Sequence, residues 1–334
     1  MDSNKKMTYD LIIIGSGPAG LTASIYASRY NLNNLVFGKK IGGTIGLAYK
    51  VENYPGFRSI PGLDLMAKIE EHSKDLGGQI VYDPVQKITK RGEPASPMSN
   101  RGEQDFIVYT LSGQTYQAKT IIVATGTERR TLGINGENEY LGKGVSYCTT
   151  CDAPFYKDKI VALVGGSDGA ISGAVHAAEY AKKVYVIYRK NQLRAEPAWI
   201  NEWKNIEVSG KGEAIYNTNI IEIKGDGQKI TQVVLDTDYK NQKELVVDGV
   251  FIEIGGVPGT SLAQEMGIEM NDEHFIKVDK WMDTNIPGVF AAGDCTDFIY
   301  GFAQMITACG MGALAARSAY VYLRKEMAPQ QRGI

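Results

Sequence analysis

The chain has 334 residues, of which 43% are hydrophobic and 22% charged, and its formal net charge is −2. This composition is typical of globular proteins and excludes disordered, collagen-like and low-complexity chains. The near-neutral charge gives no reason to expect nucleic acid or an anionic membrane as a partner. Because a single core rarely grows beyond about 250–300 residues, the length predicts about two domains.

The sequence also predicts a cellular location. The apolar run after Lys5 and Lys6 is only Leu11–Ile14 and leads into glycines, unlike a targeting signal. No stretch approaches the ~20 apolar residues of a membrane span. We therefore expect a soluble, cytoplasmic protein. Four cysteines are too few for a secreted disulfide framework, so a closely spaced pair is expected to be chemical.

A dinucleotide-binding unit is predicted near the N-terminus. A strand at Asp10–Ile14 precedes a glycine turn, a helix over Leu21–Tyr30 and a second strand at Asn34–Phe37. The turn residues are Gly15, Ser16, Gly17, Pro18, Ala19 and Gly20. In such a unit the first glycine permits the tight turn, the second lets a pyrophosphate approach the backbone, and the third lets helix and strand pack closely. The strand–turn–helix context favours this interpretation over an ordinary glycine-rich turn.

The same pattern recurs at an offset of 150 residues. A strand at Lys159–Val164 is followed by a turn, a helix to about Ala181 and a strand at Val184–Tyr188. The offset places Gly165 on Gly15, Ser167 on Gly17 and Ala170 on Gly20. Ser167 would crowd a pyrophosphate.

Basic residues follow the second strand of this repeat. Arg189, Lys190 and Arg194 stand where an acidic residue would bind a free ribose 2′-hydroxyl. Cations instead suit a 2′-phosphate, so a nicotinamide nucleotide bound here would be NADPH. The alternative is a solvated basic segment on a degenerate repeat.

Other segments are expected near the first nucleotide. The strand Ile121–Val123 ends in Ala124, Thr125 and Gly126, and a later compact segment runs from Ile286 to Asp294. A helix rich in small residues is predicted over Ile306–Leu323.

A Cys-x-x-Cys pair, Cys148 and Cys151, precedes the second repeat and is followed by Asp152. The two-residue spacer lets the sulfurs close a small disulfide, and a neighbouring acid can protonate a leaving thiolate. A zinc site would need two further ligands, but Cys295 and Cys309 are single and distant, so no metal is expected. Those two cysteines are predicted to be small buried residues.

These motifs, in this order, resemble the low-molecular-weight thioredoxin reductases over nearly the whole chain. The resemblance also includes Val51–Gly56 and Gly288–Asp294. It implies an α/β fold with two Rossmann-like (three-layer ββα) nucleotide-binding domains, the second inserted into the first. Residues 1–126 and 254–334 would bind FAD, and residues 127–253 would form the NADPH-type insert with the cysteine pair. It further implies a homodimer and a rotation of the insert.

Residue roles follow from the same resemblance. Cys151 matches the flavin-facing thiol, Cys148 the thiol that attacks thioredoxin, and Asp152 the acid. The positions that match cofactor-binding residues beyond the glycine turns are Gly43, Thr44, Asn53, Thr125, Gly126, Gly293, Asp294 and Gln304. Electrons would pass from a donor to FAD, then to the cysteine pair, then to thioredoxin or a similar disulfide protein.

Departures from the family pattern concern the electron donor. Besides Ser167, Tyr188 replaces the usual histidine before Arg189, Thr44 replaces a glutamine, and Ala303 replaces an arginine. Relatives with such departures take electrons from ferredoxin or hold a second flavin, so both remain open beside NADPH.

Two further hypotheses are weaker. A nicotinamide–ferredoxin flavin oxidoreductase would lack the cysteine pair. A redox-sensing flavoprotein without turnover would hold a reducible disulfide and reduce no partner.

Overall fold

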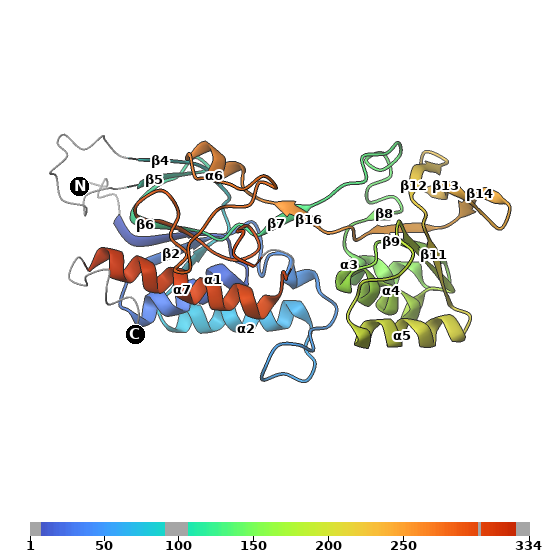
Figure 1. Cartoon of the computed structure of the whole chain (residues 1–334), viewed down its shortest axis with the longest axis horizontal. Coiled ribbons are helices and arrows are strands. Elements are labelled where there is room, and N and C mark those ends of the chain that lie inside the picture. The colour runs from blue at the N-terminus through green and yellow to red at the C-terminus, as the bar shows by residue number, and fades with distance from the viewer. Residues whose placement is uncertain (1–7, 91–105, 300–301, 325–334) are drawn as a thin grey trace. The chain divides into compact units, whose positions relative to one another are not determined.

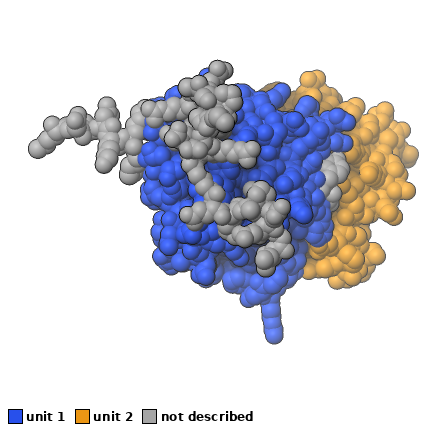
Figure 2. Space-filling view, turned by 60° about the vertical axis from the view of Figure 1, so that its left-hand side comes forward, with its two compact units in different colours: residues 1–46, 52–128, 258–334 blue, residues 47–51, 129–257 orange. Residues whose placement is uncertain are grey.

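The computed structural model describes residues 8–90, 106–299 and 302–324, and the chain divides into two compact units (Figure 1). Unit 1 comprises residues 1–46, 52–128 and 258–334, and unit 2 comprises residues 47–51 and 129–257. Figure 2 shows unit 1 in blue and unit 2 in orange. Each unit has its own sheet and core, and both are Rossmann-like.

Unit 1 is built on a seven-stranded sheet with the order β3-β2-β1-β6-β5-β4, in which β17 also pairs with β6. The pairings among β1, β2, β3, β6 and β17 are parallel, and β4 and β5 add antiparallel strands. The strands are β1 (Thr8–Ile14), β2 (Asn34–Phe37), β3 (Gln79–Val81), β4 (Val85–Lys90), β5 (Phe106–Thr110), β6 (Thr115–Val123) and β17 (Val289–Ala291).

Long helices pack against this sheet. They are α1 (Pro18–Arg29), α2 (Gly62–Asp75) and α7 (Met305–Leu323), and a short helix, α6, spans Ser261–Glu265. Helix α7 lies along α1 (Figure 1), and small residues allow the close approach. A Cβ on Gly312 would lie 2.1 Å from the Ala19 carbonyl oxygen, so this crossing needs glycine.

Unit 2 contains a parallel five-stranded sheet with the order β11-β10-β9-β15-β8 and an antiparallel three-stranded sheet. The parallel strands are β8 (Val145–Ser146), β9 (Ile160–Val164), β10 (Lys183–Tyr188), β11 (Gly212–Tyr216) and β15 (Gly249–Ile252). The antiparallel strands are β12 (Ile220–Gly225), β13 (Ile230–Tyr239) and β14 (Gln242–Val246). The helices are α3 (Thr149–Asp152), α4 (Asp168–Tyr180), α5 (Pro197–Val208) and the 3₁₀ turn η2 (Ala153–Tyr156).

Strand β9 shows how the layers of unit 2 arise. Ala162 and Val164 belong to a core with the antiparallel sheet, whereas Val161 and Leu163 belong to a core with α4 and α5. Successive side chains of a strand point to opposite faces, so this run is apolar on both sides. Unit 2 is therefore a three-layer ββα sandwich, as the sequence predicted.

The chain passes between the units through two paired strands, β7 (Thr127–Arg129) and β16 (Gly256–Pro258). The 3₁₀ turn η1 (Ile45–Leu47) leads into residues 47–51, which were not expected to join unit 2. Tyr49 stacks on His176 with ring centroids 3.7 Å apart, and its hydroxyl donates to Glu179 over 2.7 Å. These side-chain contacts have no signature in the local sequence.

The predicted repeat strands and helices are confirmed, with small shifts at their ends. The first helix begins at Pro18 and not at Leu21, because Gly17 caps it and proline is favoured at the first helical position. The C-terminal helix begins at Met305, and the second repeat strand at Lys183. Within the described residues, no helix is both long and apolar enough to cross a membrane.

Candidate functional site

The first glycine turn of unit 1 is held by backbone hydrogen bonds. The Gly15 N–H donates to the Phe37 carbonyl over 2.7 Å, and the Ala124 N–H donates to the Ile14 carbonyl over 2.8 Å. Gly15 has φ +125°, and a Cβ there would lie 2.0 Å from the Ala124 carbonyl oxygen. A Cβ on Gly20 would lie 1.8 Å from the Gly15 carbonyl oxygen. Both positions therefore require glycine, as the sequence predicted.

Gly17 is different, because nothing lies within 4 Å of where its Cβ would be. It caps α1 with an extended backbone, φ −82°. The space in front of a helix N-terminus is thus free, which fits a pyrophosphate. The Ser16 hydroxyl donates to the Lys40 carbonyl over 2.7 Å.

Two distant segments meet at this turn. A Cβ on Gly43 would lie 3.4 Å from the Gly17 Cα, and Thr44 follows it as an exposed residue. A Cβ on Gly293 would lie 3.0 Å from the Ala19 Cβ. Burial raises the pKa of the adjacent Asp294 carboxyl. Residues far apart in sequence thus surround one helix N-terminus.

Asn53 and Gln304, each expected to contact the flavin, also lie next to each other. The Asn53 side-chain amide donates to the Gln304 Oε1 over 3.1 Å. Nearby, the Tyr54 hydroxyl lies 3.9 Å from the Cys309 sulfur. Gln304 caps α7, so these polar groups lie at the start of that helix. Cys309 and Cys295 are buried free cysteines, as predicted.

The second glycine turn reproduces the first. The Gly165 N–H donates to the Ile187 carbonyl over 3.1 Å, again at the 150-residue offset. Gly165 has φ +143°. Ser167 caps α4 with φ −94°, almost the conformation of Gly17. The change from glycine to serine therefore leaves the backbone as it is and adds only a side chain.

Residues 189–196, here called the basic loop, are hydrogen-bonded to this turn and its helix. The Arg194 N–H donates to the Gly166 carbonyl over 2.8 Å, and the Asp168 carboxylate accepts from the Glu196 N–H over 2.6 Å. Arg189, Lys190 and Arg194 are exposed. The structure thus places the three cations on a loop beside the helix N-terminus. A Cβ on Gly166 would lie 2.7 Å from the Tyr188 ring, which leaves room only for glycine.

Cys148 and Cys151 form a disulfide, with 5.3 Å between their Cα atoms. Cys148 caps the short helix α3, and the Cys151 N–H donates to the Cys148 sulfur over 3.2 Å. Such a donor favours the thiolate form of a sulfur. Asp152 follows Cys151 in α3 and is half-buried.

A buried carboxylate fixes the residue before the pair. Glu137 is 2% exposed and accepts hydrogen bonds from the Tyr147 hydroxyl (2.6 Å) and from the Leu132 and Gly133 N–H groups (2.8 and 2.7 Å). Burial is the largest of the causes that raise the pKa of Tyr147, and the hydrogen bond to Glu137 is the second. Tyr147, the residue before Cys148, is therefore held in place by a buried carboxylate, and nothing in the local sequence indicates this contact.

A further match between the repeats escaped the sequence analysis. The Glu253 N–H donates to the Val164 carbonyl over 2.9 Å, as Ala124 does to Ile14. A Cβ on Gly165 would lie 2.3 Å from the Glu253 carbonyl oxygen, as a Cβ on Gly15 meets Ala124. Glu253 therefore occupies the position of Ala124. The shared glycine two residues later, Gly126 and Gly255, is the signal that could have revealed it.

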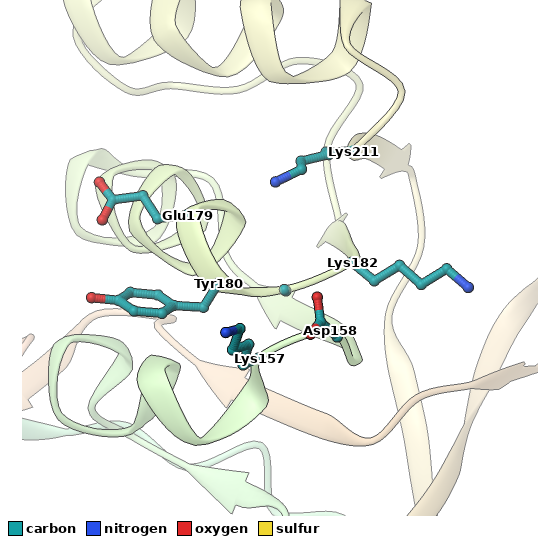
Figure 3. A pocket seen from close by; sticks show the side chains of 7 residues that line it. Lys157, Asp158, Glu179, Tyr180, Lys182 and Lys211 are labelled. Carbon is teal, nitrogen blue, oxygen red and sulfur yellow. The ribbon is translucent and has the colours of Figure 1, made fainter.

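A cavity of about 450 Å³ lies elsewhere in unit 2 (Figure 3). Its lining residues are Lys157, Asp158, Glu179, Tyr180, Ala181, Lys182 and Lys211. They lie at the end of α4 and before β9, β10 and β11, which is the amino edge of the parallel strands. Nucleotides bind at the carboxyl edge of such sheets, so this cavity is not the nucleotide site. In the described part of the chain, no cluster of three metal-ligating side chains is found.

Comparison with known proteins gives consistent results. Residues 9–312 match the family model described as pyridine nucleotide-disulphide oxidoreductase. The chain is 38% identical over 327 residues to a thioredoxin reductase from Listeria monocytogenes, covering 97% of each protein. A solved thioredoxin reductase from Lactococcus lactis matches with a TM-score of 0.86 and 34% identity, over 95% of this chain and 99% of that one. A ferredoxin-flavin thioredoxin reductase from Clostridium acetobutylicum matches with a TM-score of 0.50 and 35% identity, over 96% and 98%.

Proposed function

Because the chain belongs to the pyridine nucleotide-disulphide oxidoreductase family, among the thioredoxin reductases, we propose that it reduces a protein disulfide through Cys148 and Cys151. The family uses FAD and NADPH. The observation that carries the proposal is the Cys148–Cys151 disulfide, placed directly before a nucleotide-type βαβ unit. The substrate that we propose is thioredoxin or a similar disulfide protein.

FAD would be held by unit 1. Its pyrophosphate would lie at the N-terminus of α1, where Gly17 leaves the space free. The residues that we assign to it are Gly15, Ser16, Gly17, Pro18, Ala19, Gly20, Gly43, Thr44, Asn53, Thr125, Gly126, Gly293, Asp294 and Gln304. When bound, FAD supplies the reducing equivalents for the disulfide.

The cysteines perform the exchange. Reduction breaks the Cys148–Cys151 bond, and two electrons and two protons give two thiols. The Cys148 thiolate, favoured by the Cys151 N–H, then attacks the partner disulfide and forms a mixed disulfide. Cys151 attacks that bond, which restores the Cys148–Cys151 disulfide and releases the partner as a dithiol. Asp152 would hold the proton exchanged with a leaving thiolate.

The choice of electron donor depends on the second glycine turn, where Ser167 adds a side chain in the place that a pyrophosphate would occupy. We propose NADPH, since the second turn keeps the backbone of the first and places three cations beside it. Gly165, Ser167, Arg189, Lys190 and Arg194 would bind it. The alternative is a pyridine nucleotide-independent enzyme that takes electrons from ferredoxin or a second flavin, as the name of the Clostridium relative suggests.

A cytoplasmic location, a homodimer and the absence of nucleic acid or membrane partners complete the proposal. They rest on the composition and on the resemblance to the family. Residues 1–126 with 254–334 would form the FAD domain, and residues 127–253 the insert.

The experiment is turnover of thioredoxin by the flavin-loaded protein, with Cys148→Ser as the variant. We expect normal flavin content and no turnover, because the attacking sulfur is lost. Undiminished turnover would contradict the proposal. Anaerobic addition of NADPH then identifies the donor: bleaching of the flavin absorbance supports NADPH. An unbleached flavin that dithionite still reduces would favour ferredoxin or a second flavin.

A further inference from the structure

Glu253 is a carboxyl group that the proposed reaction does not use. It follows β15 at the carboxyl edge of the parallel sheet in unit 2 and is partly buried. The equivalent residue of unit 1 is Ala124, a bare methyl group in the same backbone position. The βαβ fold therefore does not require a carboxylate at this position, so the Glu253 side chain is expected to have a role other than folding of the unit.

The Glu253 side chain contacts the redox motif directly. The Thr149 hydroxyl donates to the Glu253 Oε1 over 3.2 Å. Thr149 directly follows Cys148 as the first residue of α3, and it is only 2% exposed. A Cβ on Gly173 of α4 would lie 3.1 Å from the Thr149 hydroxyl oxygen, so this side chain is enclosed. Glu253 thus accepts a hydrogen bond from inside the Cys-x-x-Cys sequence.

The surroundings of this carboxyl act on its pKa in opposite directions. Burial raises its pKa, whereas Arg129 and the Thr149 hydrogen bonds oppose that rise by favouring the anion. Two other carboxylates are associated with the segment around the cysteine pair. Glu137 lies on the side of Tyr147, where three donors satisfy it, and Asp152 is part of α3 itself.

We propose that Glu253 is a positioning residue for the disulfide step, holding α3 through Thr149 and opposing thiolate formation in the reduced pair with its negative charge. This inference rests on the proposed redox role of Cys148 and Cys151. When the S–S bond breaks and two electrons enter, the pair takes up one proton to give a thiol and a thiolate, or two to give two thiols. An anion nearby disfavours the thiolate. Glu253 thereby favours the fully protonated product.

Glu253→Gln removes the charge and keeps an acceptor for Thr149. The measurement is the rate at which iodoacetamide alkylates the pre-reduced, flavin-loaded protein at neutral pH, where only the thiolate reacts. We expect the variant to react about three- to tenfold faster, because each tenfold in thiolate fraction corresponds to one pKa unit. Glu244→Gln, which removes an exposed carboxylate from β14 of the same unit, should leave the rate unchanged. Equal rates for Glu253→Gln and wild type would overturn the charge role.

A second pair of variants tests the hydrogen bond and does not depend on the first. Thr149→Val loses the hydroxyl, whereas Thr149→Ser keeps it. If Glu253 positions α3, oxidised glutathione should re-form the Cys148–Cys151 disulfide several-fold more slowly in Thr149→Val, and Thr149→Ser should behave as wild type. Equal rates in both would overturn the positioning role, including the case in which Glu253→Gln does not fold. Neither assay needs thioredoxin or the physiological electron donor, because a chemical reductant can reduce the cysteine pair, so failure of this inference is distinguishable from failure of the proposed function.

Discussion

The two glycine turns have the same backbone and different side chains. Each first glycine donates to the end of the second strand of its unit, and the residue capping each helix is extended. Yet Gly17 corresponds to Ser167, and Gly20 to Ala170. Backbone hydrogen bonds thus preserve the βαβ geometry, whereas the side chains at a few positions decide which ligand fits.

The two units differ in whether the third glycine position of the motif can hold a side chain. In unit 1 a Cβ on Gly20 would lie 1.8 Å from the Gly15 carbonyl oxygen. In unit 2 Ala170 occupies the matching place and is fully buried. The helix of unit 2 therefore leaves space for a methyl group that unit 1 does not have. The same motif can thus be strict in one copy and relaxed in the other.

The largest expected effect follows from that strictness. Gly20→Val should abolish flavin binding, because the added side chain must push α1 away from the turn. The ratio of flavin to protein absorbance after purification measures it. Ala170→Gly, the matched change in unit 2, should keep full flavin content. A yellow, fully loaded Gly20→Val protein would show that the two turns do not differ in this way.

The basic loop of unit 2 should give the next largest effect. Replacing both Arg189 and Arg194 by Ala should weaken NADPH binding by about a hundredfold or more, since each of the two charge-assisted contacts contributes about 1.5–3 kcal/mol. NADH binding should change little, because it lacks the 2′-phosphate. Stopped-flow titration of flavin reduction measures both. An equal loss for the two nucleotides would argue against these arginines as the phosphate site.

A smaller effect is expected at the capping residue of α4. Ser167→Gly should tighten NADPH binding by about three- to tenfold, because it removes a side chain from the pyrophosphate space without changing the backbone. The same titration measures this change. An unaltered affinity would mean that the Ser167 side chain does not face the nucleotide.

The smallest effect concerns pH. Burial raises the pKa of Asp294, so the folded protein binds this proton more tightly than the unfolded chain. As pH rises from below the unfolded value, about 3.9, through the raised folded value, stability is lost. Asp294→Asn should remove that loss and so make the protein more stable at neutral pH. Urea unfolding at pH 4 and pH 7 measures it, and an unchanged difference between the two pH values would contradict it.

Local patterns predicted much of this molecule. The repeat strands, their helices and the C-terminal helix were predicted from apolar runs and glycine turns, since those signals are contiguous in sequence. Position by position, the roles of Gly15 and Gly20 followed from the motif alone. The pairing of Cys148 with Cys151 followed from their spacing.

The remainder depends on contacts between distant residues. Glu253 reaches Thr149 across 104 positions of sequence, and Asn53 reaches Gln304 across 251. Residues 47–51, which include Tyr49, join unit 2 although the segments before and after them belong to unit 1. No periodicity or motif predicts such long-range contacts, because they exist only after the sheets have formed.

The most direct test of the redox assignment is an anaerobic titration of the flavin-loaded protein with dithionite. If the disulfide accepts electrons from the flavin, the wild-type protein should take up about four electrons per bound flavin, two for each redox centre. The Cys148→Ser/Cys151→Ser protein should take up about two. Wild-type protein that takes up only about two, with its cysteines still oxidised, would contradict electron transfer between the flavin and the Cys148–Cys151 pair.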